Sequence, residues 1–382
     1  MKSKKLTFWE SLMLVAGAGI GTGILTIPYA ISKIGMLGTI LALVIAYAVS
    51  AVMYLMIADL TLHSKKSAEL LGILQENLFY GKYGKVFTAI FFVVLVVLLL
   101  ENLVVYILCA ANVMTELVPI DGNVAKVLFY VMASTVIIFG MKGVGVGEKY
   151  SVTLIGIVVL VLIGLSLLKP KNALPMGLGE PKLIFALYGL FMFAFSAIFS
   201  VVQVCNHIAR KEDTKKAILG GLTLNAVLTF LFAVAVMIGS NEVTEIATTG
   251  LTESLGIPVI KIICALFVLM AMFSSFWSSG FAFADVVGEQ FKIGEKSAWF
   301  LSTMPTVFIA IFLPLSILEY IQIGAGALSI ILVIVVLPAY YHAIKSEEKA
   351  LLLGKIGKSK VLITLVGICV GLMVVASLIS IP

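Results

Sequence analysis

The sequence predicts an all-α protein that crosses the membrane many times, and two observations lead to this fold class. Of its 382 residues, 61% are hydrophobic and 12% are charged, whereas soluble globular proteins carry about 25% charged residues. The apolar residues also form continuous runs, and a spanning helix needs roughly 20 of them. A membrane β-barrel would instead alternate apolar and polar residues. The chain is therefore predicted to be a polytopic helical membrane protein.

Eleven apolar runs follow one another, and each is predicted to cross the bilayer once. No connection is long enough to hold a soluble domain, so residues 1–382 are expected to form one membrane domain. The runs cover residues 8–33, 37–60, 86–115, 123–141, 151–168, 182–209, 217–239, 258–286, 298–317, 320–342 and 359–381.

Lysine and arginine predict the orientation of these spans, because the cytoplasmic loops of membrane proteins are enriched in both residues. With a cytoplasmic N-terminus, twenty of the 26 basic residues fall on the cytoplasmic side, among them Lys142 and Lys149 between the fourth and fifth runs. Eleven spans then place Pro382 on the opposite side of a plasma membrane. The net charge of +6 is spread over short loops, so nucleic acid is not an expected partner.

The first run contains the stretch GAGIGTGILTIPYA at residues 17–30. Its four glycines and Pro28 predict a helix that is broken near the middle of the membrane. Backbone groups released by such a break are tolerated only where they line a cavity or are buried in protein. Alternatively, Gly17 and Gly21 have the spacing of a tight helix–helix contact.

A broken first span predicts two kinds of ligand. The amides of Gly21, Thr22 and Gly23 would begin the second half-helix, where backbone N–H groups favour a carboxylate. The carbonyls released upstream, at Gly17, Gly19 and Ile20, suit a cation or an ammonium group. Inverted-repeat transporters place such breaks at matching positions in both halves.

The corresponding break is expected in the sixth run, where residues 196–200 are less apolar than their neighbours. The five spans within 1–168 would then form one repeat and the five within 182–342 an inverted copy, with 359–381 as an additional span.

The segments GAGIGTGILTIPYAISKIG (17–35) and AMFSSFWSSGFAFAD (271–285) resemble the amino acid/auxin permease and aromatic amino acid permease branches of the amino acid–polyamine–organocation superfamily. The resemblance implies a leucine-transporter-like fold with a five-plus-five inverted repeat and discontinuous helices 1 and 6. It also implies amino acid transport by alternating access, with spans 1, 2, 6 and 7 rocking against spans 3, 4, 8 and 9.

The same resemblance assigns substrate-binding roles. The amides of Gly21, Thr22 and Gly23 match those that hold the substrate carboxylate, and the segment around Phe195 matches the one that holds the amine and gates the site. Ala197 stands where the family usually has glycine, which leaves the register of the second break open. The expected substrate-binding residues are Gly19, Gly21, Thr22, Gly23, Tyr106, Phe193, Phe195, Ser196 and Phe199.

A cation site is also implied. Gly17, Ile20, Ala271, Ser274 and Ser275 match the common sodium site of this fold, and five neutral oxygens suit a hard monovalent cation. Alternatively, serines in a helix often bond back to their own backbone. Some relatives replace sodium by a lysine in the fifth span, but here that region reads TLIGIVV, which favours sodium.

Glu101 lies near the middle of the third run, where an ionised carboxylate is costly. It is either a proton-coupling residue or a neutral carboxyl bonded to a neighbouring helix. The predicted function is therefore import of a neutral, apolar or aromatic amino acid by sodium symport. Proton symport through Glu101, or a non-transporting sensor of the same fold, is the alternative. Neither enzymatic activity nor a cofactor beyond the coupling ion is expected, and the oligomeric state is left open.

Overall fold

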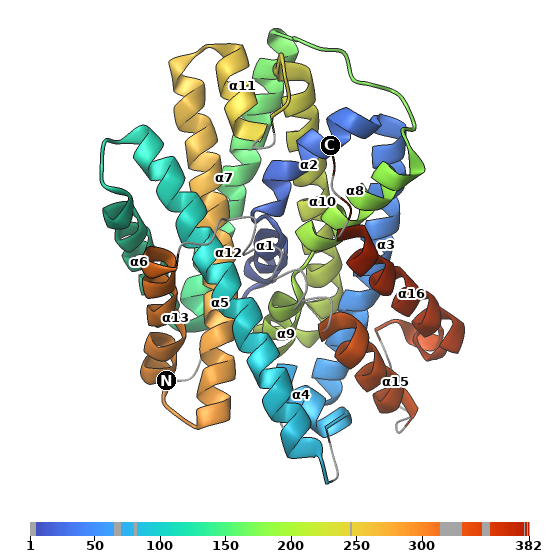
Figure 1. Cartoon of the computed structure of the whole chain (residues 1–382). Helices are drawn as coiled ribbons and strands as arrows, with labels where there is room; N and C mark the ends of the chain where they lie inside the picture. Colours follow the sequence, from blue (N-terminus) through green and yellow to red (C-terminus); the bar gives the residue numbers. More distant parts are fainter. Residues whose placement is uncertain are drawn as a thin grey trace.

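The computed structural model describes residues 5–64, 70–79, 82–244, 247–313, 331–345 and 352–377, together with 379 and 381. These residues form a bundle of α-helices, with α1 near its middle (Figure 1). Over this part of the chain the only extended pairing is a single parallel bridge between Leu6 and Ile208. The predicted all-α class is confirmed.

The elements follow the apolar runs closely. In chain order they are α1 (Phe8–Gly19), α2 (Gly23–Ile34), α3 (Met36–His63), α4 (Leu70–Asn77), α5 (Gly84–Leu117), α6 (Gly122–Ile138), α7 (Gly140–Leu168), α8 (Pro181–Ala194), α9 (Ile198–His207), η1 (Lys211–Asp213), α10 (Thr214–Gly239), α11 (Ala247–Leu255), α12 (Pro258–Phe291), α13 (Glu295–Phe312), η2 (Ile331–Val336, a π-helix), α15 (Leu337–Lys345), η3 (Gly354–Lys358) and α16 (Lys360–Ser377).

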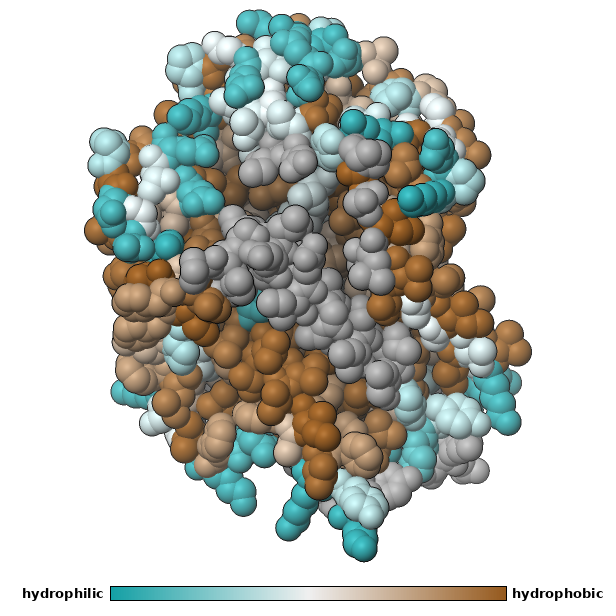
Figure 2. Space-filling view, in the orientation of Figure 1, coloured by the Kyte–Doolittle hydropathy of each residue, from teal (hydrophilic) through white to brown (hydrophobic). Residues whose placement is uncertain are grey.

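Six of the described helical segments are long and apolar enough to cross a membrane, and the α1–α2 pair can form a seventh span. Two further apolar helices, α6 and most of α16, are shorter. On the face shown in Figure 2, hydrophilic side chains gather at the two ends of the molecule, and the coloured residues between them are mainly apolar. The count of eleven spans is not confirmed, and residues 320–330 of the predicted tenth run lie outside the described residues.

Both predicted helix breaks are present. α1 ends at Gly19 and α2 begins at Gly23, with an angle of 57° between the two helices. α8 ends at Ala194 and α9 begins at Ile198. The second break therefore covers residues 195–197 and lies slightly before the expected stretch 196–200.

One predicted loop is wrong. Residues 142–150 were expected to connect two spans on the cytoplasmic side, but α7 begins at Gly140 and includes Lys142 and Lys149. The buried residues of this part of α7 recur at helical spacing, at Met141, Val144 and Glu148. The charged residues led to the wrong prediction of a loop, because they interrupt the apolar run without interrupting the helix.

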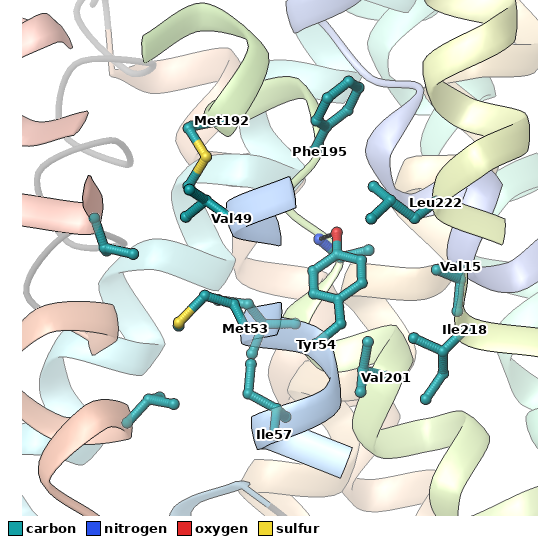
Figure 3. Close-up of a cluster of buried hydrophobic side chains, with 14 of the residues drawn as sticks. Val15, Val49, Met53, Tyr54, Ile57, Met192, Phe195, Val201, Ile218 and Leu222 are labelled. Atoms are coloured by element: carbon teal, nitrogen blue, oxygen red, sulfur yellow. Dashed lines mark hydrogen bonds between the residues drawn. The ribbon is translucent and has the colours of Figure 1, made fainter. Parts of the chain in front are cut away.

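The buried side chains divide into two packed clusters. The first is drawn mainly from α2, α3, α8, α9 and α10, and Figure 3 shows part of it, with Tyr54 directed toward the α8–α9 connection. The second is drawn mainly from α5, α6, α7, α12 and α13. α1 contributes Val15 to the first cluster and Ala16 to the second, so it lies between the two groups of helices.

Candidate substrate and cation site

A cavity lies where the two helix breaks meet. Its empty volume is about 600 Å³, including the part open to solvent. None of the described lining residues is charged. The lining comprises Ala18, Gly19, Gly21, Thr22, Gly23, Leu98, Asn102, Tyr106, Phe193, Ala194, Ser196, Ala197, Ile198, Phe199, Ser200, Ser278 and Ser279.

Eight of the nine expected substrate-binding residues line this one cavity, although they come from α1, α2, α5, α8, α9 and the breaks between them. Phe195 is the exception. Its side chain is fully buried and stacks on Phe191, with 5.8 Å between the ring centroids. The ring expected to gate the site therefore belongs to the core, because Phe195 lies on the side of the break that faces α3 and α10 (Figure 3).

The start of α2 faces the cavity with its backbone. Thr22 is the N-cap residue, and its side chain makes no capping hydrogen bond. A helix start without a side-chain cap leaves N–H groups available to an anion. The ring of Tyr106 lies close by, since a Cβ added to Gly21 would be 3.6 Å from its Cε1 atom. The Tyr106 hydroxyl donates to Asn102 Oδ1 at 3.1 Å, which orients this ring from α5.

Two polar residues that were not predicted from the sequence hold the second break open. The Asn225 side chain on α10 donates to the carbonyl of Ala194, where α8 ends, at 3.0 Å. The backbone N–H of Ala197 donates to the Tyr54 hydroxyl on α3 at 2.8 Å. Both bonds satisfy groups that an unbroken helix would have paired internally. An Asn and a Tyr within apolar runs were the only signals in the sequence.

The expected cation-binding residues also come together. The Ser275 hydroxyl on α12 donates to the carbonyl of Ile20 at 3.3 Å, across the first break. Ser274 lies beside Gly17, because a Cβ added to that glycine would collide with the Ser274 hydroxyl. Ala271 precedes these serines by one helical turn and is fully buried. The serines therefore face α1 and do not bond back to their own helix.

A sixth residue, Glu148 on α7, shares this position. The Ser274 hydroxyl donates to Glu148 Oε2, and a Cβ at Gly17 would also collide with that oxygen. Glu148 is completely buried, and no described residue offers a hydrogen bond to its Oε1 atom. Glu101, the acidic residue singled out from the sequence, is buried on α5 but does not line the cavity.

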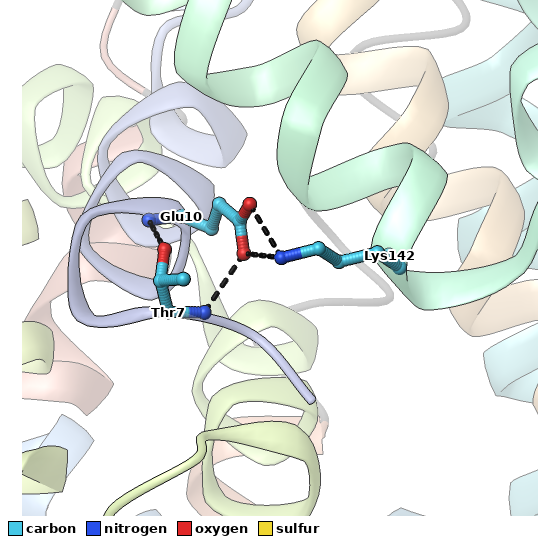
Figure 4. Close-up of polar contacts among 3 residues, drawn as sticks. All are labelled: Thr7, Glu10 and Lys142. Carbon is cyan, nitrogen blue, oxygen red and sulfur yellow. Dashed lines mark hydrogen bonds and ion pairs between the residues drawn. The ribbon is translucent and has the colours of Figure 1, made fainter. Parts of the chain in front are cut away.

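An ion pair joins α1 to α7 at the start of both helices (Figure 4). Lys142 Nζ lies 2.6 Å and 2.5 Å from the two carboxylate oxygens of Glu10. Glu10 also accepts the Thr7 backbone N–H at 2.8 Å, and the Thr7 hydroxyl accepts the Glu10 N–H, which forms a capping box. The pair anchors the first turn of α1 against α7, on the N-terminal side of the break.

The sequence of residues 4–377 matches the model of the tryptophan/tyrosine permease family. The chain belongs to that family. This membership confirms the resemblance to the aromatic amino acid permeases and identifies a multi-pass membrane transporter, not an enzyme. A search of curated proteins finds no match.

Solved structures show the fold of this permease. It is similar to MhsT in complex with L-phenylalanine, with a TM-score of 0.70 and 12% identity over 96% of this chain and 98% of that one. It is also similar to Mhp1, a nucleobase-cation-symport-1 family transporter with bromovinylhydantoin bound, with a TM-score of 0.69 and 13% identity over 98% and 91% of the two chains. The permease therefore has the leucine-transporter fold.

Proposed function

We propose that this permease imports a neutral amino acid with an apolar or aromatic side chain across the plasma membrane by sodium symport. The observation that carries the proposal is the uncharged cavity at the junction of two helix breaks. The uncapped start of α2 supplies amides for the substrate carboxylate, with Gly21, Thr22 and Gly23 beside them. The carbonyls around the second break suit the substrate amine.

The substrate's side chain is expected to lie against the aromatic residues of the cavity. Phe193, Phe199 and Tyr106 lie on three different helices around it and offer an apolar surface. The described lining residues include no lysine or arginine that could pair with a second carboxylate. An acidic substrate is therefore not favoured. The phenylalanine in the complex of MhsT supports the same class of ligand for this fold.

Sodium is the proposed coupling ion. The carbonyls of Gly17, Ile20 and Ala271 and the hydroxyls of Ser274 and Ser275 are neutral oxygen donors, the chemistry that a hard monovalent cation prefers. The bound ion would supply positive charge that draws α12 to the broken part of α1. In this way ion binding would stabilise the arrangement of α1 that exposes the amides of α2 to the substrate.

Alternating access is proposed to move the two packed clusters relative to each other. The first cluster is drawn mainly from α2, α3, α8 and α9, the second mainly from α5, α6, α7, α12 and α13, and α10 contributes to both. Tightly packed groups of this kind move as rigid bodies. The N-terminus is proposed to be cytoplasmic, with inverted repeats within 1–168 and 182–342 and an additional span at 359–381.

The test is uptake of labelled L-phenylalanine, L-tryptophan and L-tyrosine into proteoliposomes under an imposed sodium or proton gradient. Sodium-driven uptake that is unchanged in Glu101→Gln is the expected result. Proton-driven uptake that is lost in Glu101→Gln would contradict sodium coupling and assign the coupling to α5. Binding of these amino acids without uptake under either gradient would indicate a sensor.

A further inference from the structure

The carboxylate of Glu148 is directed into the junction of α1, α7 and α12. One oxygen accepts the Ser274 hydroxyl, and the same oxygen lies against Gly17. The other oxygen, Oε1, is buried without a hydrogen-bond partner among the described residues. A buried carboxylate normally has all its oxygens paired, because an unpaired polar group in a dry interior is costly. The unpaired oxygen therefore indicates that the described residues leave out one partner of this carboxylate, as a bound cation would be.

Glu148 lies deep in the bundle. Ser274 is the seventeenth of the 34 residues of α12, so its carboxylate partner lies level with the middle of that spanning helix. The neighbouring lysines of α7 do not neutralise it. Lys142 pairs with Glu10, and Lys149 is exposed. No described lysine, arginine or histidine forms an ion pair with Glu148.

We propose that Glu148 is a ligand of the coupling cation and supplies the negative charge of its site. This inference rests on the proposed sodium symport and adds one residue to the oxygen set named there. Sodium bound by neutral oxygens alone would carry its full charge into the membrane interior. With Glu148 as a ligand, the ion and its site together are neutral, which lowers that cost.

The role of Ser274 follows from the same contact. By donating its proton to Glu148 Oε2, the hydroxyl holds the carboxylate in place and keeps its own oxygen lone pairs available to the ion. Gly17 is required at this point, because any side chain there would displace both groups. α1, α7 and α12 would thus all contribute to one ion site, although the three helices are far apart in the sequence.

The inference is tested by equilibrium binding of ²²Na⁺ to the purified full-length permease, with unlabelled NaCl and KCl as competitors. Glu148→Gln keeps the shape of the side chain but removes the charge, and Glu148→Asp keeps the charge on a shorter side chain. Glu295→Gln, at an exposed position at the start of α13, is the matched control. The unfolding temperature in KCl checks that each variant is folded.

We expect wild type and Glu295→Gln to bind sodium equally, and Glu148→Gln to bind it at least tenfold more weakly. The sodium affinity of Glu148→Asp should lie between those of wild type and Glu148→Gln. If Glu148→Gln does not fold, the affinity of Glu148→Asp tests the inference. Wild-type sodium affinity in the folded Glu148 variants would overturn the inference and leave sodium symport intact. No sodium binding by the wild type, with uptake driven by protons, would overturn both.

Discussion

The hydroxyl of Ser275, at the middle of α12, donates a 3.3 Å hydrogen bond to the carbonyl of Ile20, the residue at which α1 breaks. This carbonyl has lost its usual partner within the helix, so a side chain from another helix satisfies it. The contact joins the first break to the helix that carries the proposed cation ligands. It is the geometric basis for linking ion binding to the conformation of α1.

Replacing Ser275 by alanine is expected to raise the sodium concentration that gives half-maximal amino acid uptake by about fivefold. The change removes one hydrogen bond and one proposed ligand, and a hydrogen bond contributes about 1 kcal/mol. The sodium dependence of uptake in proteoliposomes measures the effect. Thr135→Ala, an exposed hydroxyl on α6 bonded to its own helix, should behave like wild type.

Replacing Gly19 by alanine is expected to reduce uptake at least tenfold and to lower the unfolding temperature. The added Cβ would lie 2.6 Å from the carbonyl of Ala194 and would collide with the Asn225 amide that holds that carbonyl. The two breaks would be forced apart. Gly122→Ala at the start of α6 is the control, since nothing lies within 4 Å of the added atom. Equal behaviour of the two variants would contradict the assignment.

Phe195 and Phe199 are expected to respond differently to truncation. Phe195→Ala should destabilise the permease by about 3 kcal/mol, since it leaves a cavity in the core. Phe199→Ala should weaken phenylalanine binding about tenfold with little change in unfolding temperature, because its ring lines the substrate cavity. Thermal unfolding and direct binding separate the two effects. A stable Phe195→Ala with lost binding would restore the gating role predicted from the sequence.

The ion pair between Glu10 and Lys142 is expected to stabilise the contact of α1 with α7. Lys142→Ala leaves a Glu10 side chain that is only 7% exposed without its cation, at a cost of about 2 kcal/mol. Lys149→Ala, an exposed lysine on the same helix, should cost nearly nothing. A double-mutant cycle with Glu10→Gln in chemical unfolding gives the coupling energy, and additive effects would show that the pair does not stabilise the fold.

Much of the site could be predicted from local sequence. Glycines around Ile20, followed by Pro28, favour a break in this apolar run, because helix propensity and the absence of water act on each segment separately. Ser274 and Ser275 were identified through the family resemblance, and the structure places them against that break.

The positions of Phe195 and Glu148 could not be predicted in this way. The sequence shows that Phe195 lies beside a break, but only the packing of α3 and α10 decides that its ring enters the core and not the cavity. Glu148 follows three glycines and precedes a lysine, so local composition indicated a solvated connection. Its spacing from Met141 and Val144 was the one signal of a buried helical face.

The sequence by itself determined that the chain is an all-α membrane protein, that its first helix is broken, and which family it resembles. These properties depend on hydropathy and on short motifs, which are local along the chain. The tertiary structure alone decided which polar groups meet at the break, because Gly17, Glu148 and Ser274 become neighbours only when α1, α7 and α12 pack together. The charge of the proposed cation site is a property of that packing.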